Sequence, residues 1–486
     1  MKRIANIFVL CAASAIALPA QTFTTLVRFD GTDGELPFSG LVQGADGNLY
    51  GTTSGNATVC SGGECGTVFK ISPRGTLTTL YSFCAQNGCT DGLSPYAGLV
   101  LATNGDFYGT TQYGGAYGSG TVFKITPGGA LTTLYSFCPQ GDGNCTDGQN
   151  PSVASLVQAH NGDFYGATQQ GGGANSGTIF TITPSGTLTT LYSFCSAIGC
   201  PDGSSPNGLI QAADGDFYGT TGFGGVPAPG AAASGTVFKI TASGALTTLY
   251  TFCCASGSEP LGALVQGVDG NFYGTTTGGG TGAYGTVFEI TPTGKLTKLY
   301  NFCSQSGCTD GSRPYGQLVH GTDGNFYGTT IAGGANYGGT IFKITPSGAL
   351  TTLYSFCSSL PGCADGYQPT TGLVQATNGN FYGTTFNGGM GYGGQGFGTV
   401  FRLSVGLGPF VKTLPHSGTV GEVIRILGTD LTGATSVSFN GTPAAFNVVS
   451  ATEITATVPA GATTGKIRVT TPGGALFSGG PFLVLP

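Results

Sequence analysis

The sequence is poor in the side chains on which many enzymes and nucleic-acid-binding proteins depend. It has no tryptophan and three histidines, and 8% of its 486 residues are charged, against roughly 25% in ordinary globular chains. The formal net charge is −6, and the lysines and arginines form no basic stripe. Because nucleic-acid binding depends on clustered positive charge, we expect no nucleic-acid partner.

Long apolar runs and catalytic motifs are also scarce. After the first twenty residues, no stretch approaches the roughly eighteen apolar residues of a membrane-spanning helix, so we expect no transmembrane segment. There is no nucleophile elbow, zinc-binding histidine pair or phosphate-binding loop, and no two carboxylates have a spacing that suggests a glycosidase. The sequence therefore predicts no catalytic residues.

Residues 1–20 have the pattern of a secretory signal peptide. Two basic residues precede an apolar run from Ile4 to Leu18, and the small Ala20 follows. Cys11 lies inside the apolar run without the surroundings of a lipid-attachment site. We therefore expect an exported protein, secreted or held at the cell surface, from which this leader has been removed.

What the sequence has in abundance is a repeat of 53–58 residues. Its clearest copy, residues 77–125, contains four short runs, LTTLYSF, GLVLA, DFYGTT and GTVFKI. Each run is rich in β-branched and aromatic residues and is bounded by Gly, Pro, Asn or Asp, which is typical of strands and turns. The tyrosine of the third run marks seven copies, at Tyr50, Tyr108, Tyr165, Tyr218, Tyr273, Tyr327 and Tyr382.

Seven copies of four strands predict an all-β fold, a seven-bladed β-propeller with four-stranded blades over residues 22–404. A β-helix needs shorter and more uniform coils. Within a blade we expect the GLV run innermost and the LTTLYSF run outermost. The last copy ends at Leu403 without an outer strand. Residues 24–29 are therefore predicted to complete that blade and to close the ring, which removes open sheet edges.

Glycine positions give two more local predictions. Asn104-Gly105 and its equivalents join the first two strands of each copy, and they favour type I′ hairpins, in which both central residues have positive φ. Gly109, inside the FYGTT run, is predicted to allow a close approach near the crowded axis.

Fourteen cysteines follow the leader, and they fall into close pairs. Their even count, their short spacing and the export signal favour disulfides, each worth roughly 2 kcal/mol in the chain-entropy model. Zinc is the weaker interpretation, because no histidine lies nearby and a structural site needs four ligands. The adjacent pair is the least favourable, since it requires a strained ring. The predicted pairs are Cys60–Cys65, Cys84–Cys89, Cys138–Cys145, Cys195–Cys200, Cys253–Cys254, Cys303–Cys308 and Cys357–Cys363.

Strand alternation places the cysteine loops on one face of the predicted disc, which we call the disulfide-loop face. All the variation in loop length lies there too, and loops on a rigid scaffold commonly carry binding residues. The aromatic residues of these loops are also explained if they simply cover their own glycine-rich loops. The predicted binding residues are Tyr96, Tyr113, Tyr117, Tyr284, Tyr315, Tyr337, Tyr367 and Tyr392, and the loops also contain Phe223 and Phe397.

The acid that recurs is the aspartate of a Cys-x-Asp-Gly motif. A ring of such carboxylates could hold Ca²⁺ through oxygen ligands. We favour the simpler interpretation, an Asx turn before glycine that needs no ligand, and therefore predict no cofactor, with Ca²⁺ as the alternative. The residues are Asp91, Asp147, Asp202, Asp310 and Asp365, with Asp33 in the first copy, which lacks the motif's cysteine.

The cycle DGNFYGTT … KITPSGALTTLYSF resembles the GloVer-type tandem repeat of secreted bacterial proteins, over about residues 22–403. That resemblance implies an extracellular location and no particular reaction. Residues 405–486 lack cysteines and break the period; their FNGTPA and ITATVPAGATTG runs resemble an IPT/TIG domain. This second resemblance implies an immunoglobulin-like β-sandwich that acts as a spacer or interaction module, and the alternating strands support a sandwich independently.

The blade layout is also similar to the propeller of streptogramin B lyases, which use histidines and a bound Mg²⁺ near the axis. The repeats of this chain contain two histidines, His160 and His320. Both flank Asn-Gly or Asp-Gly turns, opposite the disulfide-loop face and three blades apart, so we expect solvated turn residues. The lyase chemistry is therefore not carried over.

Near-identical copies argue against a single active site, because such a site needs one blade with an acid, base or nucleophile that the others lack. We therefore predict a non-enzymatic binding or interaction scaffold. Its partner would be a glycan or an extracellular protein, bound at the disulfide-loop face. A propeller lyase or hydrolase of unknown substrate and a purely structural envelope or matrix protein stay open as alternatives.

Overall fold

The computed structural model describes residues 21–55, 65–140, 145–151, 155–226, 233–358, 362–389 and 396–486. The predicted signal peptide, residues 1–20, lies outside the described residues. Regular structure in the described ranges is almost entirely β-strand. The helices found there are three short 3-10 turns, η1 (Asn87–Cys89), η2 (Cys254–Ser256) and η3 (Ser306–Cys308). The all-β prediction is confirmed.

The repeat forms seven antiparallel sheets within the described residues, each running from a short inner strand to an outer strand. In the third and sixth sheets the inner strand is divided in two. The first three sheets contain β2 (Val42–Gln43), β3 (Leu49–Thr53), β4 (Thr67–Ile71) and β5 (Leu77–Ser82); β6 (Val100–Leu101), β7 (Phe107–Thr111), β8 (Thr121–Ile125) and β9 (Leu131–Ser136); and β10 (Gln149–Pro151) with β11 (Val157–Gln158), β12 (Phe164–Gln170), β13 (Thr178–Ile182) and β14 (Leu188–Ser193).

The remaining sheets follow the same order of strands. The fourth to sixth sheets contain β15 (Ser204–Gln211), β16 (Phe217–Phe223), β17 (Thr236–Ile240) and β18 (Leu246–Thr251); β19 (Val265–Gln266), β20 (Phe272–Thr276), β21 (Thr286–Ile290) and β22 (Leu296–Asn301); and β23 (Ser312–Pro314) with β24 (Val319–His320), β25 (Phe326–Ala332), β26 (Thr340–Ile344) and β27 (Leu350–Ser355). The seventh contains β28 (Val374–Gln375), β29 (Phe381–Thr385), β30 (Thr399–Ser404) and β1 (Thr22–Arg28).

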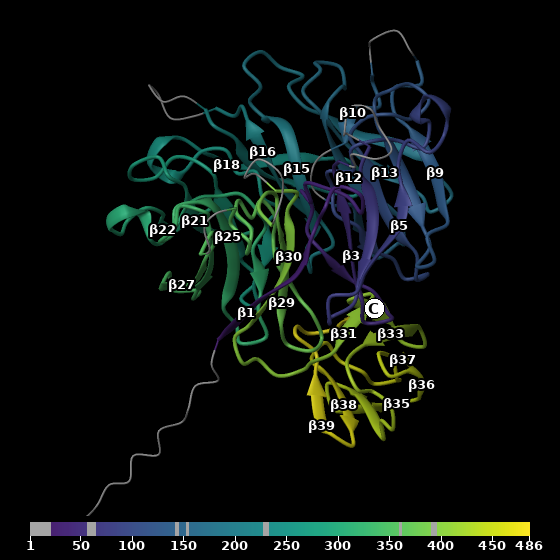
Figure 1. Ribbon diagram of the computed structural model, residues 1–486. Helices are drawn as coiled ribbons and strands as arrows, with labels where there is room; N and C mark the ends of the chain where they lie inside the picture. The colour runs from purple at the N-terminus through teal and green to yellow at the C-terminus, as the bar shows by residue number, and fades with distance from the viewer. Residues whose placement is uncertain are drawn as a thin grey trace, which may run out of the picture.

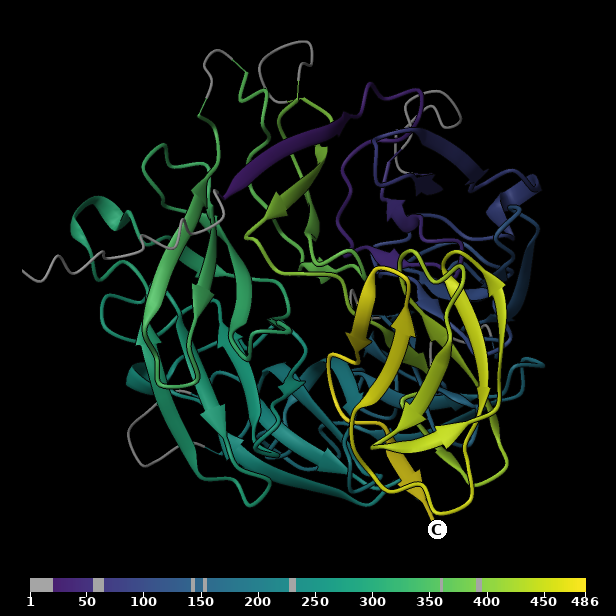
Figure 2. The same ribbon diagram turned by 90° about the horizontal axis from the view of Figure 1, so that it is seen from below.

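The N-terminal strand completes the last sheet. β1 pairs antiparallel with β30, with Phe23 opposite Leu403 and Arg28 opposite Thr399. Figure 2 shows the purple β1 beside the green strands of that sheet. The prediction that the outer strand of the last copy comes from the start of the chain is confirmed.

Neighbouring sheets pack through an aromatic pair that the repeat places at six of the seven junctions between described sheets. The ring of Tyr108 in the second sheet lies 4.0 Å, centroid to centroid, from Phe164 in the third. Between the last and first sheets Leu49 replaces the phenylalanine, and it shares a buried cluster with Tyr382. The sheets lie around a common centre in a propeller-like arrangement (Figure 2). The other pairs are Tyr50–Phe107, which is tilted, and the stacked pairs Tyr165–Phe217, Tyr218–Phe272, Tyr273–Phe326 and Tyr327–Phe381, at 4.0–4.1 Å.

The inner hairpins differ from the type I′ turns that the sequence predicted. Gly105 has a φ of 91°, but Asn104 is absent from the residues with positive φ in the described part of the chain. Instead, the Asn104 side chain accepts a hydrogen bond from the amide of Asp106, at 3.0 Å. This Asx turn leaves only the glycine in the left-handed region, which suits a type I turn followed by a bulge.

Gly109 is required by the packing of its own sheet. A Cβ at this position would lie 2.7 Å from Cζ of Phe123 and 2.9 Å from Cδ2 of Leu99. The predicted close approach is therefore confirmed, and its partners are side chains of the neighbouring strands.

The C-terminal domain is a pair of four-stranded sheets around a separate apolar core that includes Ile424, Val437 and Val469. β32 (Ser417–Thr419) pairs in parallel with β40 (Leu483–Leu485) at its edge. The two larger sheets contain β31 (Lys412–Leu414), β33 (Val423–Leu427), β37 (Glu453–Thr457) and β36 (Phe446–Ser450), and β35 (Thr442–Ala444), β34 (Ser436–Phe439), β38 (Ile467–Thr471) and β39 (Gly474–Phe477).

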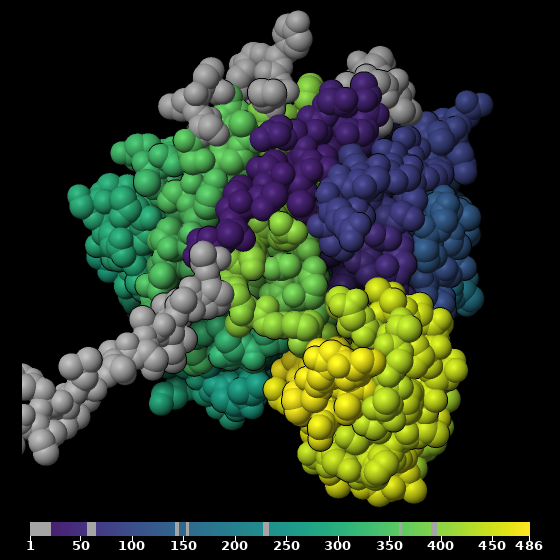
Figure 3. Space-filling model, turned by 60° about the horizontal axis from the view of Figure 1, so that its bottom comes forward, coloured from purple at the N-terminus to yellow at the C-terminus, as the bar shows by residue number. Residues whose placement is uncertain are grey.

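This domain packs against the side of the sheets where the inner hairpins turn, which we call the turn face (Figures 1 and 3). The Thr452 hydroxyl donates to the carbonyl of Ala45 at 2.7 Å, and the Phe410 amide donates to the carbonyl of Thr377 at 2.9 Å. Leu427 joins the apolar cluster between the first two sheets. The turn face is therefore partly covered by a second domain, while the disulfide-loop face lies at the opposite side.

Candidate functional site

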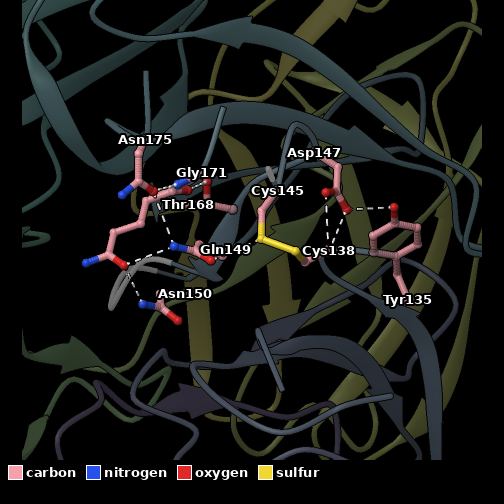
Figure 4. The surroundings of a disulfide bond; sticks show 10 residues. Tyr135, Cys138, Cys145, Asp147, Gln149, Asn150, Thr168, Gly171 and Asn175 are labelled. Carbon is pink, nitrogen blue, oxygen red and sulfur yellow. Dashed lines mark hydrogen bonds between the residues drawn. A yellow bond between two sulfur atoms is a disulfide. The ribbon is translucent and has the colours of Figure 1, made fainter. Parts of the chain in front are cut away.

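Disulfides close the cysteine loops of five sheets within the described residues, as the sequence predicted. Cys65 is disulfide-bonded as well, and Cys60 lies outside the described residues. Figure 4 shows the Cys138–Cys145 bond, with Asp147 and Tyr135 beside it. The bonded pairs are Cys84–Cys89, Cys138–Cys145, Cys195–Cys200, Cys303–Cys308 and Cys357–Cys363.

The predicted pairing of Cys253 with Cys254 is wrong, because both are free thiols. Their loop is shorter than the others: four positions separate Cys253 from Gly257, against eight from Cys303 to Gly311. Ser256 stands where the other loops have aspartate, and its hydroxyl accepts a hydrogen bond from the Cys253 amide at 3.2 Å. A serine contact thus fastens a loop in which adjacent cysteines would need a strained ring.

The recurrent aspartates fasten the cysteine loops to the outer strands. Asp310 is fully buried, and its carboxylate accepts hydrogen bonds from the Tyr300 hydroxyl and the Ser304 amide, each at 2.9 Å. Burial and the bonded carboxylate of Asp202 raise the pKa of Tyr192 to about 12. The same tyrosine–aspartate contact joins Tyr81 to Asp91, Tyr135 to Asp147, Tyr192 to Asp202 and Tyr354 to Asp365, at 2.8–2.9 Å.

These contacts support a structural role for the aspartates. In the part of the chain that the structure describes, no group of three or more His, Cys, Asp or Glu side chains is arranged to hold a metal ion. The Ca²⁺ alternative stays an untested prediction.

The predicted binding tyrosines occupy different settings. Tyr96 and Tyr315, from the second and sixth sheets, lie edge-on to Phe38 of the first sheet, with centroid distances of 5.3 and 5.9 Å. Phe386 of the seventh sheet lies 5.6 Å from the same ring. The others are Tyr113, Tyr117, Tyr284 and Tyr337, which are exposed, Tyr367, which is half-buried, and Tyr392, which lies outside the described residues.

A cavity of about 900 Å³ runs between the inner strands of the sheets, and we call it the axial cavity. Phe38 and Tyr315 line its end at the disulfide-loop face, and inner-strand residues such as Val319 form its wall. At the turn face, Lys412 and Ser417 of the C-terminal domain line it. The cavity thus has an aromatic end and an end closed in part by a second domain.

All three histidines of the chain line the turn-face end of the axial cavity. His160 and His320 come from the inner hairpins of the third and sixth sheets, and His416 comes from the C-terminal domain. As expected, His160 and His320 flank turns; His160 is exposed and His320 is half-buried. In addition, they line the cavity together with Lys412 of the C-terminal domain.

The ionisable side chains at the turn-face end of the axial cavity are all basic among the described residues. The described residues that line the axial cavity include no aspartate or glutamate. Burial lowers the pKa of Lys412 to about 8. Desolvation inside the cavity, with the charges of Lys412 and His160, lowers the pKa of His416, which is solvent-exposed. Desolvation also lowers the pKa of His160 and His320. Near neutral pH the histidines are therefore mainly neutral, and Lys412 carries the positive charge.

Two models of known protein families match this chain. The model of the Gloeobacter/Verrucomicrobia repeat matches residues 14–149, 58–264, 142–309 and 227–443. The chain belongs to the Gloeobacter/Verrucomicrobia repeat family. The model of the IPT/TIG domain matches residues 410–483. Both resemblances that the sequence suggested are thereby confirmed.

A search of solved structures finds proteins that are similar to this Gloeobacter/Verrucomicrobia repeat protein at low identity. A fungal alcohol oxidase in complex with copper is 14% identical, covers 94% of this chain and 98% of its own, and has a TM-score of 0.49. A 6-phosphogluconolactonase-like protein from Bacteroides fragilis is 16% identical (79% and 92% covered, TM-score 0.44). The periplasmic gluconolactonase of Pseudomonas aeruginosa is 20% identical (65% and 84% covered, TM-score 0.41). No curated protein matches the chain.

None of the helices among the described residues has the length and apolar character needed to cross a membrane.

A ring of glutamines at the turn face shows how the repeat is varied beside the cavity. Gln158, at the end of an inner strand, accepts a hydrogen bond from the Thr103 amide of the preceding sheet, at 2.9 Å. Leu101 and His320 occupy the same position in the second and sixth sheets. His320 therefore replaces a glutamine that would link two sheets. The equivalent amide bonds are Thr377 to Gln43, His160 to Gln211, Ala213 to Gln266 and Thr322 to Gln375, at 2.9–3.1 Å.

Sequence reasoning missed Phe38 and the residues of the C-terminal domain that line the cavity. A signal for Phe38 existed, because it follows a proline in its copy as Tyr96 and Tyr315 do in theirs. No such signal marks Lys412 or His416 in this Gloeobacter/Verrucomicrobia repeat protein. Their role depends on how the two domains pack, which neither repeat nor motif encodes locally.

Proposed function

We propose that this chain is an exported, non-enzymatic binding protein whose disulfide-loop face holds a glycan at the aromatic end of the axial cavity. One observation carries the proposal: Tyr96 and Tyr315, both predicted as binding residues, meet around Phe38 from three different sheets. Phe38 and Tyr315 also line the cavity opening. Tyrosine offers an apolar face and a polar tip, which suits a ligand that has both.

The proposed scaffold is a seven-bladed propeller with a closed ring. β1 supplies the outer strand of the last sheet, and the Tyr382–Leu49 cluster joins the last sheet to the first. The Thr377 amide also donates to the Gln43 side chain across this junction, at 2.9 Å. A ring fastened in this way holds the aromatic residues of different sheets in fixed positions, which lowers the entropic cost of binding.

The disulfides support the proposed export. Structural disulfides form and persist in oxidising compartments and are rare in the cytosol. Five are present in the described residues, and each closes a short loop on the proposed binding face. The leader pattern of residues 1–20 points in the same direction.

A concave binding site also fits the observations better than a catalytic one. Ligand sites for small molecules are hollows of about 300–1,000 Å³ lined by apolar and aromatic side chains with a few polar groups, and the axial cavity has this size and lining. Because the described lining includes no carboxylate, it lacks the acid and base pair of glycoside hydrolysis.

The test is a glycan array with the exported full chain, followed by titration of any bound glycan against variants. We expect Tyr315→Ala and Tyr96→Ala to weaken binding by about 2 kcal/mol, roughly 30-fold, as for a buried aromatic contact at an interface centre. Tyr337→Ala is the matched control, since Tyr337 is 76% exposed on the same face. Circular dichroism would check folding.

Either of two results would reject the proposal. One is an array with no bound glycan. The other is an affinity that falls in Tyr337→Ala and is unchanged in Tyr315→Ala, which would move the contact to the outer loops.

A further inference from the structure

The turn-face end of the axial cavity holds a cation that no carboxylate neutralises. Among the described residues, Lys412 has no ion pair, whereas Lys239 lies 2.6 Å from Asp216 and 3.2 Å from Asp214. The Lys412 ammonium donates a hydrogen bond to the carbonyl of Gln375. The same ammonium lies 5.6 Å from the centroid of the Phe410 ring. Since an ammonium group has three donors, the bond to Gln375 uses one of them.

A second, independent feature of the same wall is an unpaired hydroxyl. Ser417 is 2% exposed, lines the cavity, and its Oγ has no hydrogen-bond partner among the described residues. Buried polar groups in native proteins are nearly always paired, so an exception calls for an explanation. A bound oxygen atom would provide the missing partner.

We propose that this end of the axial cavity binds a small oxyanion, a carboxylate or phosphate group, between Lys412, His416 and Ser417. Ammonium, imidazole and hydroxyl groups all donate hydrogen bonds, and charge-assisted bonds to carboxylate or phosphate oxygens are the strongest of this kind. The site lies at the opposite end of the cavity from the aromatic residues around Phe38. The anion site therefore does not depend on whether the aromatic end binds a glycan.

The charged groups near the site set the pH dependence. His160, His320 and His416 line the same end, and the charge of Lys466 reaches His320 together with those of Asp269 and Asp323. Asp269 and Asp323 are already bonded to Tyr273 and Tyr327, each at 2.8 Å.

An anion stabilises the protonated form of Lys412, whose pKa in the free protein is lowered to about 8. Binding is therefore strong below that pH and weakens as the pH rises above it, by up to tenfold per pH unit. Protonation of the histidines at lower pH adds to the affinity.

The test is calorimetric titration of the exported full chain with malonate and, separately, with inorganic phosphate, at constant low chloride. We expect one bound anion per chain, and malonate affinity that falls between pH 7.5 and pH 9. Malonate is used for the pH series because its charge is constant over this range. Binding of malonate alone assigns a carboxylate site, binding of phosphate alone assigns a phosphate site, and binding of both assigns the shared oxyanion chemistry.

Variants separate this site from the protein surface. Lys412→Met keeps an unbranched side chain, one heavy atom shorter, and removes the charge, and we expect at least a tenfold loss of affinity. Ser417→Ala removes one hydrogen bond, for which we expect a smaller loss of about fivefold. The matched control is Lys295→Met, which removes an exposed lysine at an outer turn. The proposal is overturned if neither anion binds at millimolar concentration, or if Lys295→Met weakens binding while Lys412→Met does not.

Discussion

On the disulfide-loop face the same polar contact recurs from sheet to sheet, whereas at the turn face the ionisable side chains of the cavity each occur once. Asp310 and its four counterparts all accept a hydrogen bond from an outer-strand tyrosine. In contrast, His160 and His320 each differ from the residue that the other copies carry at that position, and His416 comes from the C-terminal domain.

The difference indicates how a nearly symmetric repeat acquires a site. Contacts that every copy makes fasten its own loop or sheet and therefore contribute to stability. A residue that only one copy carries is not needed for the fold of that copy, since the other copies fold without it. His320 is such a residue, and the aromatic side chain after proline, as in Phe38, occurs in three of the seven copies; both Phe38 and His320 line the axial cavity. Departures from the repeat are thus the places to look for binding.

The largest effect is expected from removing the repeated tyrosine–aspartate contact, compared with removing the serine contact in the loop that lacks the aspartate. We expect Asp310→Ala to destabilise the protein by about 3 kcal/mol, because several donors, including the Tyr300 hydroxyl and the Ser304 amide, lose a buried carboxylate. Ser256→Ala, in the loop without aspartate, removes the hydroxyl that bonds to Cys253 and should cost about 1 kcal/mol.

Urea unfolding followed by circular dichroism measures both values, with the disulfides kept intact. Asp310→Asn serves as a control that preserves shape and removes the charge. Equal losses in Asp310→Ala and Ser256→Ala would mean that the aspartate contact adds nothing beyond what the serine loop already has.

The fold was predictable from the sequence because its causes are local and repeated. The alternating runs gave the strands, and the incomplete last copy indicated where the strand of residues 22–28 pairs. The type I′ turns were wrong because the Asn104 side chain bonds to the amide of Asp106 and removes the need for positive φ at Asn104. Cys253–Cys254 was wrong because a shortened loop uses Ser256 instead.

The candidate site was predictable only in part. Tyr96 and Tyr315 were found because aromatic residues in variable loops are conspicuous in the sequence. The basic end of the cavity was not found, because it forms where the C-terminal domain packs on the turn face. Lys412 is 92 positions from His320 (412 minus 320), and no motif joins them. Contacts between domains depend on surface shape, which a repeat pattern does not reveal.

A second prediction tests the ring of glutamines on the turn face. Gln43 joins the first and last sheets through bonds to the amide and hydroxyl of Thr377, at 2.9 and 3.0 Å, and both residues are buried. We expect Gln43→Leu to cost about 2 kcal/mol, since the Thr377 amide is left without a partner away from water. The matched variant Gln158→Leu should cost under about 1 kcal/mol, because water reaches the exposed Thr103.

Thermal unfolding of the two variants gives the comparison. If Gln158→Leu proved as costly as Gln43→Leu, burial at the junction of the first and last sheets would not be what makes that link important.

The smallest effect is expected where a departure from the repeat is reversed. His320→Gln restores the residue that five other sheets carry at this position, so stability at pH 7.5 should change by less than about 0.5 kcal/mol.

The pH dependence of stability should change instead. Burial lowers the pKa of His320 in the folded protein, so the unfolded chain binds a proton more readily, and the native protein loses stability as the pH falls through about 6.5. His320→Gln should lose less stability than the native protein between pH 7.5 and pH 5.5. Urea midpoints of the native protein and of His320→Gln at the two pH values measure this difference. If His320→Gln were much less stable than the native protein at pH 7.5 and lost as much stability on acidification, His320 would be a structural part of the repeat rather than a departure from it.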